Sequence, residues 1–261
     1  MLALFLLILV PVIMWCGQSV LLLAAGLPIR IRISSTGLPP RLQSVNRTIT
    51  YIAFAAVLVA YPALRGESTV RYYMDFFPLT GRYAFFHGIL VSALYLAALY
   101  LGWVVTDNVR FEIRHRTAKL VRRLLLAPVS AVFGAMIEEL LFRALLLAGL
   151  LESFSTPVAV AVGAIVFAAA HYIRRVKRHW TFAGHIGLGL LLCTAFVCTR
   201  ALWLPIGLHA GGILLITSFR PFLRYTGPGW LVGVSIFPYA GATGIVALML
   251  LTLNIWIVYG G

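Results

Sequence analysis

The sequence predicts an all-α membrane protein, a polytopic helix bundle with about eight transmembrane helices. Apolar residues make up 62% of its 261 positions and charged residues only 11%, and the mean hydropathy is +0.99. Soluble globular chains are about 45–50% apolar and about 25% charged. Because one spanning helix needs about 20 apolar residues, roughly eight of them account for the chain. We therefore expect a single integral-membrane domain over residues 1–261.

Eight apolar stretches separated by polar or proline-containing segments are expected to cross the membrane. Several prolines fall in the gaps or at helix starts, where proline is tolerated. The first stretch has no basic segment before it and is long for the apolar core of a signal peptide, so it is expected to be retained. The predicted spans are 1–25, 48–64, 83–106, 124–151, 157–173, 181–200, 203–219 and 230–259.

The positive charges alternate from loop to loop and predict an orientation. The chain has 21 Lys and Arg against 7 Asp and Glu. The loops after the first, third, fifth and seventh spans hold sixteen of the basic residues, and the other loops hold four. By the positive-inside rule the sixteen face the cytoplasm, which places both termini outside. The sixteen are Arg30, Arg32, Arg41, Arg47, Arg110, Arg114, Arg116, Lys119, Arg122, Arg123, Arg174, Arg175, Lys177, Arg178, Arg220 and Arg224.

The segment 108–123 interleaves basic residues with apolar ones such as Val109, Phe111 and Leu120. This composition is typical of a short helix at the membrane surface, and we expect anionic lipid to bind it and the other cytoplasmic loops. Nucleic-acid binding is not expected, because the neighbouring segments are membrane spans. The predicted domain thus consists of N-terminal spans (1–107), an interfacial basic helix (108–123), central spans (124–219) and a C-terminal span (220–261).

Three charged residues lie inside the fourth span: Glu138, Glu139 and Arg143. Each charged side chain in a span costs about 2.5–3.5 kcal/mol on insertion scales, so the three are expected to face the protein interior. Glu139 and Arg143 are four residues apart, with the acid first, which favours an ion pair on one helix face. Glu138 is rotated by about 100° from Glu139. It is either free for chemistry or part of one buried structural network with the other two.

Two histidines lie in other spans, His171 at the end of the fifth and His209 early in the seventh. A single histidine in an apolar helix is more often a packing residue than a ligand or a base. Two of them together with an unpartnered glutamate favour a site in which a carboxylate and an imidazole hold one water, with the carboxylate as general base.

These residues form three motifs in order: Glu138-Glu139-x-x-x-Arg143, Phe167-x-x-x-His171, and His209 in a following helix. The chain resembles the CAAX prenyl endopeptidase and bacteriocin-processing (CPBP, or ABI) family of glutamate-type intramembrane proteases. The resemblance covers about residues 124–215 and makes 124–219 the family-like catalytic core. The segment from Leu202 to His209 also resembles the family's third motif.

The resemblance implies a role for each residue. Glu138 is expected to be the catalytic base that activates water, and His171 to hold the same water. His209 is expected to help stabilise the oxyanion of the tetrahedral intermediate. Glu139 and Arg143 are expected to support the site by fixing the helix and its charge. The resemblance favours a site without a metal or cofactor, with zinc as the less favoured alternative.

One position departs from the family's pattern. Four residues after His209 the family often has an asparagine, and here Ile213 stands in its place. Loss of one oxyanion donor can cost about 10²–10³ in rate. Three outcomes are open: another donor substitutes, such as a backbone N–H near Gly211-Gly212, the enzyme is slow, or the chain is a non-catalytic member. His185 and Asn254 are further polar residues in spans, each expected to be structural.

The leading hypothesis is an intramembrane endopeptidase that cleaves a membrane-associated protein or peptide, at a C-terminus or at a leader or sorting tail. A zinc protease with Glu138, His171 and His209 as ligands is an alternative, although no HExxH motif is present. A non-catalytic scaffold, immunity or regulatory protein is another, and a transporter a fourth. Arginine far outnumbers lysine, which favours a bacterial inner-membrane protein.

Overall fold

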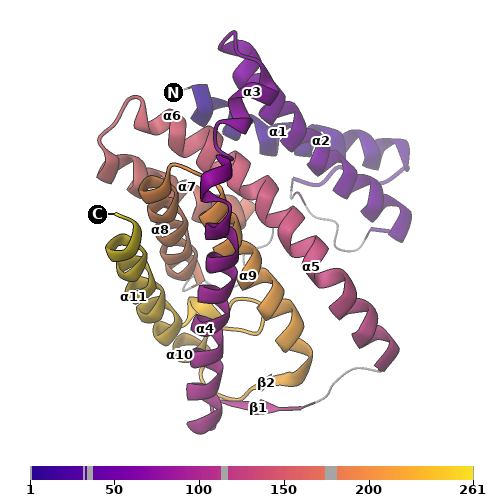
Figure 1. Ribbon diagram of the computed structural model, residues 1–261. Coiled ribbons are helices and arrows are strands. Elements are labelled where there is room, and N and C mark those ends of the chain that lie inside the picture. Colours follow the sequence, from indigo (N-terminus) through magenta and orange to yellow (C-terminus); the bar gives the residue numbers. More distant parts are fainter. Residues whose placement is uncertain (1, 32, 34–37, 113–116, 174–180, 261) are drawn as a thin grey trace.

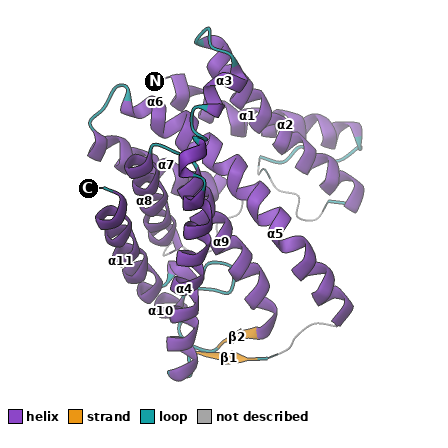
Figure 2. Ribbon diagram, viewed as in Figure 1, coloured by secondary structure: helices purple, strands orange, loops and turns teal. Residues whose placement is uncertain are grey.

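The computed structural model describes residues 2–31, 33, 38–112, 117–173 and 181–260, without the side chains of 117–119, 122, 123 and 173. Almost all of the described chain is helical (Figures 1 and 2). The helices are α1 (Leu2–Ala24), α2 (Pro40–Leu64), α3 (Thr69–Met74), α4 (Tyr83–Val105), α5 (Thr117–Glu139), α6 (Ala148–Leu151), α7 (Thr156–Ile173), α8 (Thr181–Thr199), α9 (Trp203–Phe219), α10 (Gly229–Val232) and α11 (Ala242–Tyr259). A π-helix, η2 (Leu140–Leu147), joins α5 to α6, and the 3₁₀ turns are η1 (Leu79–Gly81), η3 (Arg220–Phe222) and η4 (Pro238–Ala240).

The predicted all-α, multi-pass membrane fold is confirmed. Within the described residues, six helices are long and apolar enough to cross a membrane: α1, α2, α4, the continuous helix that includes Leu124–Leu151, α8 and α11. The shorter α7 is also apolar. Together with α9, these helices occupy the eight stretches expected from the sequence.

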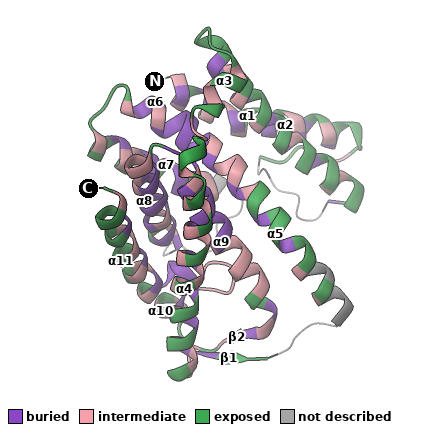
Figure 3. Ribbon diagram, in the orientation of Figure 1, coloured by how far each residue is buried: buried purple, intermediate pink, exposed green. Residues whose placement is uncertain are grey.

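The helices pack as a bundle around α9 and α8. Helix α9 packs between α4 and α5, while α8 packs between α7 and α11. Helices α1 and α2 pack on one another and contact η2, and Figure 1 shows them at the end of the bundle opposite the small sheet. Figure 3 shows exposed outer faces on α2, α4, α5 and α11, whereas α8 is largely buried. Such apolar outer faces are expected of helices that meet lipid.

Small residues allow α4 and α9 to cross at close range. A Cβ atom added at Gly207 would collide with the backbone oxygen of Phe85, and one added at Gly88 would lie 2.6 Å from the backbone nitrogen of Leu208. One turn further along α9, a Cβ at Gly211 would lie 2.9 Å from Cα of Ile89. This small-xxx-small spacing is typical of membrane helices whose backbones approach closely. It fixes α9 on α4 and so fixes the position of His209.

The expected interfacial helix over 108–123 is not formed at its start, and this prediction is wrong there. Residues Val109–Phe111 form strand β1, which pairs antiparallel with β2 (Leu223–Tyr225). Val109 is buried in a cluster with Trp103 and Leu223, whereas Arg110 and Phe111 are exposed. This pairing satisfies backbone groups that a surface helix would satisfy internally. Helical structure resumes in α5 at Thr117, and residues 113–116 lie outside the described residues.

Two helix starts differ from the predicted spans. The last span was expected to begin at residue 230, but α11 begins at Ala242. The intervening chain turns at Gly233, whose φ of 72° favours glycine, and then passes through Pro238. Helix α2 begins at Pro40, earlier than the expected 48, because proline suits the first turn of a helix. Of the basic residues used to predict the orientation, those at 32, 114, 116, 174, 175, 177 and 178 lie outside the described residues, as do the side chains at 119, 122 and 123.

Candidate active site

A fully buried ion pair lies at the junction of α5 and η2. Arg143 Nε is 3.1 Å from Glu139 Oε2, and its Nη1 donates a hydrogen bond of 3.2 Å to Oε1 of the same carboxylate. Both side chains are inaccessible to solvent. The guanidinium also lies over the Phe167 ring, 4.7 Å from its centroid, and Nη2 donates to the backbone oxygen of Gly189 at 3.4 Å. The predicted Glu139–Arg143 pair therefore links α5 to both α7 and α8.

His209 of α9 continues this network. Its Nδ1 lies 2.7 Å from Glu139 Oε1, and its side chain is only 7% exposed. A carboxylate oxygen can only accept, so Nδ1 carries a proton and donates it to Glu139. The Nε2 atom on the other edge of the ring is thereby turned toward Glu138, from which it is 3.7 Å away. Glu139 thus sets the orientation of His209 as well as that of Arg143.

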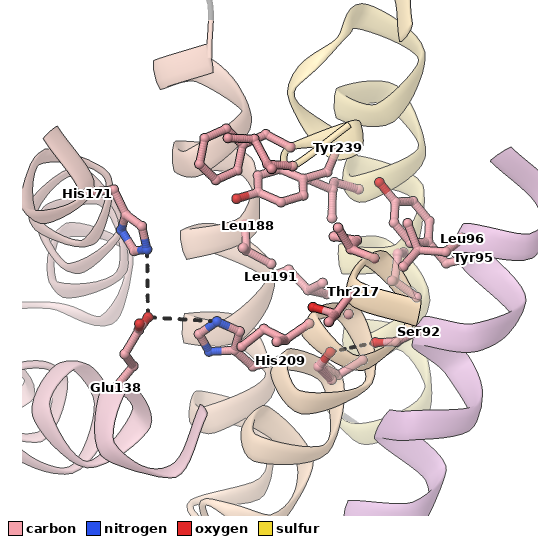
Figure 4. A pocket seen from close by; sticks show the side chains of 18 of the residues that line it. Ser92, Tyr95, Leu96, Glu138, His171, Leu188, Leu191, His209, Thr217 and Tyr239 are labelled. Atoms are coloured by element: carbon pink, nitrogen blue, oxygen red, sulfur yellow. Dashed lines mark hydrogen bonds and ion pairs between the residues drawn. The ribbon is translucent and has the colours of Figure 1, made fainter. Parts of the chain in front are cut away.

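Glu138 points toward two imidazoles, those of His171 and His209 (Figure 4). Its Oε2 is 3.7 Å from Nε2 of His171 and 3.7 Å from Nε2 of His209. These separations exceed a direct hydrogen bond and suit groups that share a bridging water. Among the described residues, Glu138 Oε2 has no hydrogen-bond partner although the atom itself is buried. Glu138 thus lies outside the Glu139–Arg143 pair, and His209 contacts both glutamates.

His171 is oriented from its other side by its own helix. Its Nδ1 lies 2.8 Å from the backbone oxygen of Phe167, one turn earlier in α7, and therefore donates to it. The imidazole also contacts the Phe167 ring, with centroids 4.5 Å apart, and the His185 ring at 4.8 Å. Because Nδ1 is occupied, Nε2 is the nitrogen left to face Glu138.

The helix carrying the two glutamates changes register directly after them. Residues Leu140–Leu147 form a π-helix, a feature that often occurs at functional sites. The Tyr72 hydroxyl from α3 donates a hydrogen bond of 2.7 Å to the backbone oxygen of Ala144 within this segment. Nothing in the apolar sequence of this stretch had predicted the π-helix.

A cavity of about 260 Å³ opens beside Glu138, between α4, α8, α9 and α11. Glu138, His171 and His209 form one wall, and Leu188, Leu191 and Leu251 contribute apolar surface. Ile213 lines the cavity, so position 213 presents an apolar side chain there and no side-chain hydrogen-bond donor. A largely apolar cavity with a few converging polar groups is typical of a ligand site.

Two polar residues named from the sequence have different outcomes. His185 is 1% exposed and packs against His171, so it belongs to the surroundings of the site. Asn254 is exposed on α11 and is not among the residues lining the cavity. The sequence analysis missed Tyr239 of η4, which lines the cavity and hydrogen-bonds His185. Tyrosine in a loop after an apolar span carries no motif that could have identified it.

The zinc alternative requires three ligand side chains at one point. Among the described residues, no three His, Cys, Asp or Glu side chains are placed so that they could hold one metal ion. The contacts of His171 and His209 are to a backbone oxygen, to Glu139 and to the shared oxygen of Glu138.

Comparison with family models supports the assignment drawn from these motifs. The model described as "Type II CAAX prenyl endopeptidase Rce1-like" matches residues 120–215. The match confirms the family suspected from the sequence. It includes both glutamates, Arg143, both histidines of the site and Ile213. Because the Rce1-like family is a peptidase family, the match supports a membrane endopeptidase at the level of the family.

Comparisons with curated proteins and with solved structures gave no significant match. The similarity to known proteins found by these comparisons is therefore the Rce1-like match over residues 120–215. Helices α1 to α4 lie outside this segment, as do η4 and α11. Tyr72, which binds the π-helix, and Tyr239, which lines the cavity, are consequently contributions of this chain beyond the matched segment.

Proposed function

We propose that this protein is an intramembrane endopeptidase that hydrolyses a peptide bond with a water activated by Glu138. The observation that carries the proposal is the placement of Glu138 Oε2, buried and 3.7 Å from the Nε2 atoms of both His171 and His209. A carboxylate and an imidazole that hold one water from two sides constitute a general base with an orienting partner. The Rce1-like match supports the same class of reaction.

Counting protons in this site gives each group a role. Nδ1 of His171 donates to the Phe167 oxygen, and Nδ1 of His209 donates to Glu139. If both rings are neutral and Glu138 is ionised, the two Nε2 atoms and the Glu138 carboxylate are three acceptors that face the same point. A water there donates only two protons. All three contacts form only when one of the three groups carries an additional proton. His209 is best suited to carry it, because the Glu139 carboxylate lies 2.7 Å behind the ring.

The steps of hydrolysis follow from this arrangement. Glu138 takes a proton from the water as its oxygen attacks the carbonyl carbon, and the carbonyl π electrons move to the oxygen. The Nε2–H of a protonated His209 donates to this oxyanion. Glu138 then returns the proton to the leaving amine as the C–N bond breaks. Arg143 and Glu139 hold the Nδ1 edge of His209 in place throughout.

The deciding experiment compares Glu138→Gln with a matched control, Glu152→Gln. Glu152 is an exposed acid that forms an ion pair with Arg65 and does not line the cavity. Termini of membrane proteins from cells with either variant would be measured by mass spectrometry, and cleavage would be measured with purified full-length chain. Termini produced by the wild type and the control, but not by Glu138→Gln, are expected, with a fall of at least about 10² in rate. Cleavage retained by Glu138→Gln would overturn the proposal.

A non-catalytic role is favoured by one observation, the presence of Ile213 on the cavity wall. Under this alternative the chain binds a membrane partner as a scaffold, immunity or regulatory protein. Unchanged phenotype in a Glu138→Gln/His171→Phe double variant would support it. Metal analysis of chelator-treated protein distinguishes the zinc-dependent alternative from the metal-free one. Activity that persists in protein without zinc would exclude the zinc-dependent alternative.

The substrate class and placement remain part of the proposal. We infer that the substrate is a membrane-associated protein or peptide, processed at a C-terminus or at a leader or sorting tail. The distribution of arginine supports a bacterial inner membrane, with both termini outside and anionic lipid at the cytoplasmic loops.

A further inference from the structure

The cavity wall lacks the amide donor expected at position 213, which raises the question of which group takes its place. His209 Nε2 supplies one donor to an oxyanion, and peptide hydrolysis is faster with a second. Within the described residues that line the cavity, hydroxyl groups come from Ser92, Tyr95, Thr217 and Tyr239, and Arg220 supplies a guanidinium. Each can be judged by its own contacts.

Four of these groups are unsuitable. The Ser92 hydroxyl donates to the backbone oxygen of Leu208 at 2.6 Å, and the Tyr95 hydroxyl donates to the backbone oxygen of Gly244 at 3.0 Å. Both hydroxyl protons are thus used in hydrogen bonds that join α4 to neighbouring helices. Thr217 lies eight residues after His209, about 12 Å along the helix at 1.5 Å per residue, and Arg220 lies still further along.

The hydroxyl of Tyr239 differs in its partner. It lies 3.2 Å from His185 Nε2, and His185 Nδ1 lies 2.7 Å from the backbone oxygen of Thr181. Nδ1 therefore donates to that oxygen, and Nε2 of the neutral ring accepts the proton of Tyr239. The contact is long for an O–H donor, for which 2.7–2.8 Å is usual. A proton held this weakly can move to a stronger acceptor, and an oxyanion is such an acceptor.

Tyr239 is also held where an oxyanion donor is needed. Figure 4 shows its hydroxyl end turned toward the part of the cavity where Glu138 and His171 lie. The close approach of Gly184 to the Ala240 backbone and of Gly244 to the Tyr239 backbone fixes η4 between α8 and α11. Burial and the charge of Glu138 both raise the pKa of Tyr239 above its usual range. The hydroxyl thus stays protonated at all physiological pH values.

We propose that Tyr239 is the second oxyanion donor of the site and takes over the function of the amide absent at position 213. The inference rests on the proposed peptidase function. In the free protein the hydroxyl donates to His185. When a peptide bond enters the cavity and water attacks it, the hydroxyl donates to the carbonyl oxygen as that oxygen becomes negative. Tyr239 is then a catalytic residue supplied from outside the Rce1-like segment.

The test uses the full-length chain in detergent and a quenched fluorescent library of apolar eight-residue peptides as probe. Tyr239→Phe is expected to lower kcat by about 10²–10³ with little change in KM, because the donor acts on the transition state. Tyr100→Phe is the matched control, since Tyr100 is a buried tyrosine of α4 that does not line the cavity. It is expected to keep kcat within about twofold.

A second substitution separates catalysis from structure. In the Tyr239→Phe background, Ile213→Asn restores an amide donor to the cavity wall and is expected to recover at least about tenfold in kcat. A tyrosine that only supported the packing of His185 would give no such rescue. Unchanged kcat in Tyr239→Phe, or loss without rescue in a variant with a wild-type unfolding midpoint, would overturn the inference. If Glu138→Gln abolishes cleavage in the same assay, the peptidase proposal stands whatever Tyr239→Phe gives. If the wild type and Glu138→Gln cleave the library equally, both proposals fail.

Discussion

Nδ1 of His209 lies 2.7 Å from Oε1 of Glu139, a carboxylate that is itself fully buried against Arg143. The imidazole is therefore held at one edge by a structural charge while its other edge faces Glu138. Adjacent acids on one helix thus have opposite surroundings. Glu139 is in close contact with Arg143 at 3.1 Å and with His209 at 2.7 Å, whereas the buried Oε2 of Glu138 lies 3.7 Å from each of two imidazoles, beyond direct hydrogen-bond distance.

This relationship predicts different effects for the two glutamine variants. Glu139→Gln leaves Arg143 charged and fully buried, and breaking such a pair typically costs about 3–5 kcal/mol. Its unfolding midpoint in detergent is expected to fall by at least about 5 °C, as followed by tryptophan fluorescence. Glu138→Gln removes no buried pair, and its midpoint should stay within about 2 °C of the wild type. Equal midpoints for the two variants would contradict the assignment of Glu139 as the structural acid.

The crossing of α4 and α9 gives a prediction on packing. In Gly207→Ala the added Cβ would collide with the Phe85 backbone oxygen, which cannot move without shifting α4. We expect a loss of about 1–3 kcal/mol in unfolding free energy and a displaced His209, with reduced activity. Gly212→Ala in the same helix has nothing within 4 Å of the new Cβ and should leave stability unchanged. Thermal unfolding of the two alanine variants, compared side by side, measures the difference, and similar midpoints would count against the close crossing.

The π-helix after Glu139 gives a prediction with a paired control. Tyr72→Phe removes the hydrogen bond to the Ala144 oxygen, and Tyr73→Phe removes a similar one to the Leu58 oxygen of α2, 2.9 Å long. Each loss should cost about 0.5–1.5 kcal/mol in unfolding free energy. Only Tyr72 contacts the helix that carries the glutamates, so only Tyr72→Phe is expected to lower kcat, by about tenfold or less. Equal kcat values for the two variants would show that this bond does not position the site.

The sequence was sufficient for the helices and for the three-motif core because both depend on short-range patterns. Apolar length predicts a span, and a four-residue spacing on a helix predicts the Glu139–Arg143 pair. The rotation of Glu138 by about 100° from Glu139 predicts that it lies outside this pair, and its catalytic role, implied by the family resemblance, stays a prediction. Each of these patterns lies within one helix, whose regular geometry fixes which residues share a face.

The features that were missed depend on contacts between distant segments. Strand β1 forms only because Leu223–Tyr225 lies beside it, more than a hundred residues later. The π-helix follows apolar residues that would equally suit an α-helix, and Tyr72 contacts it from α3. Tyr239 reaches the cavity through a loop whose path is set by packing on Gly184 and Gly244. No local pattern encodes such long-range approaches.

The proposed orientation predicts which ends of the bundle are accessible from outside the cell. Ser153, after α6, and Arg224, in β2, are both exposed and lie at opposite ends of the bundle (Figure 1). Each would be replaced by cysteine in a chain whose own Cys16, Cys193 and Cys198 are alanine. A membrane-impermeant maleimide is expected to label Ser153→Cys on intact spheroplasts, and Arg224→Cys only after permeabilisation, because the arginine-rich loops stay in the cytoplasm. The reverse labelling would invert the topology. It would also place Arg220, which lines the cavity, toward the outer face.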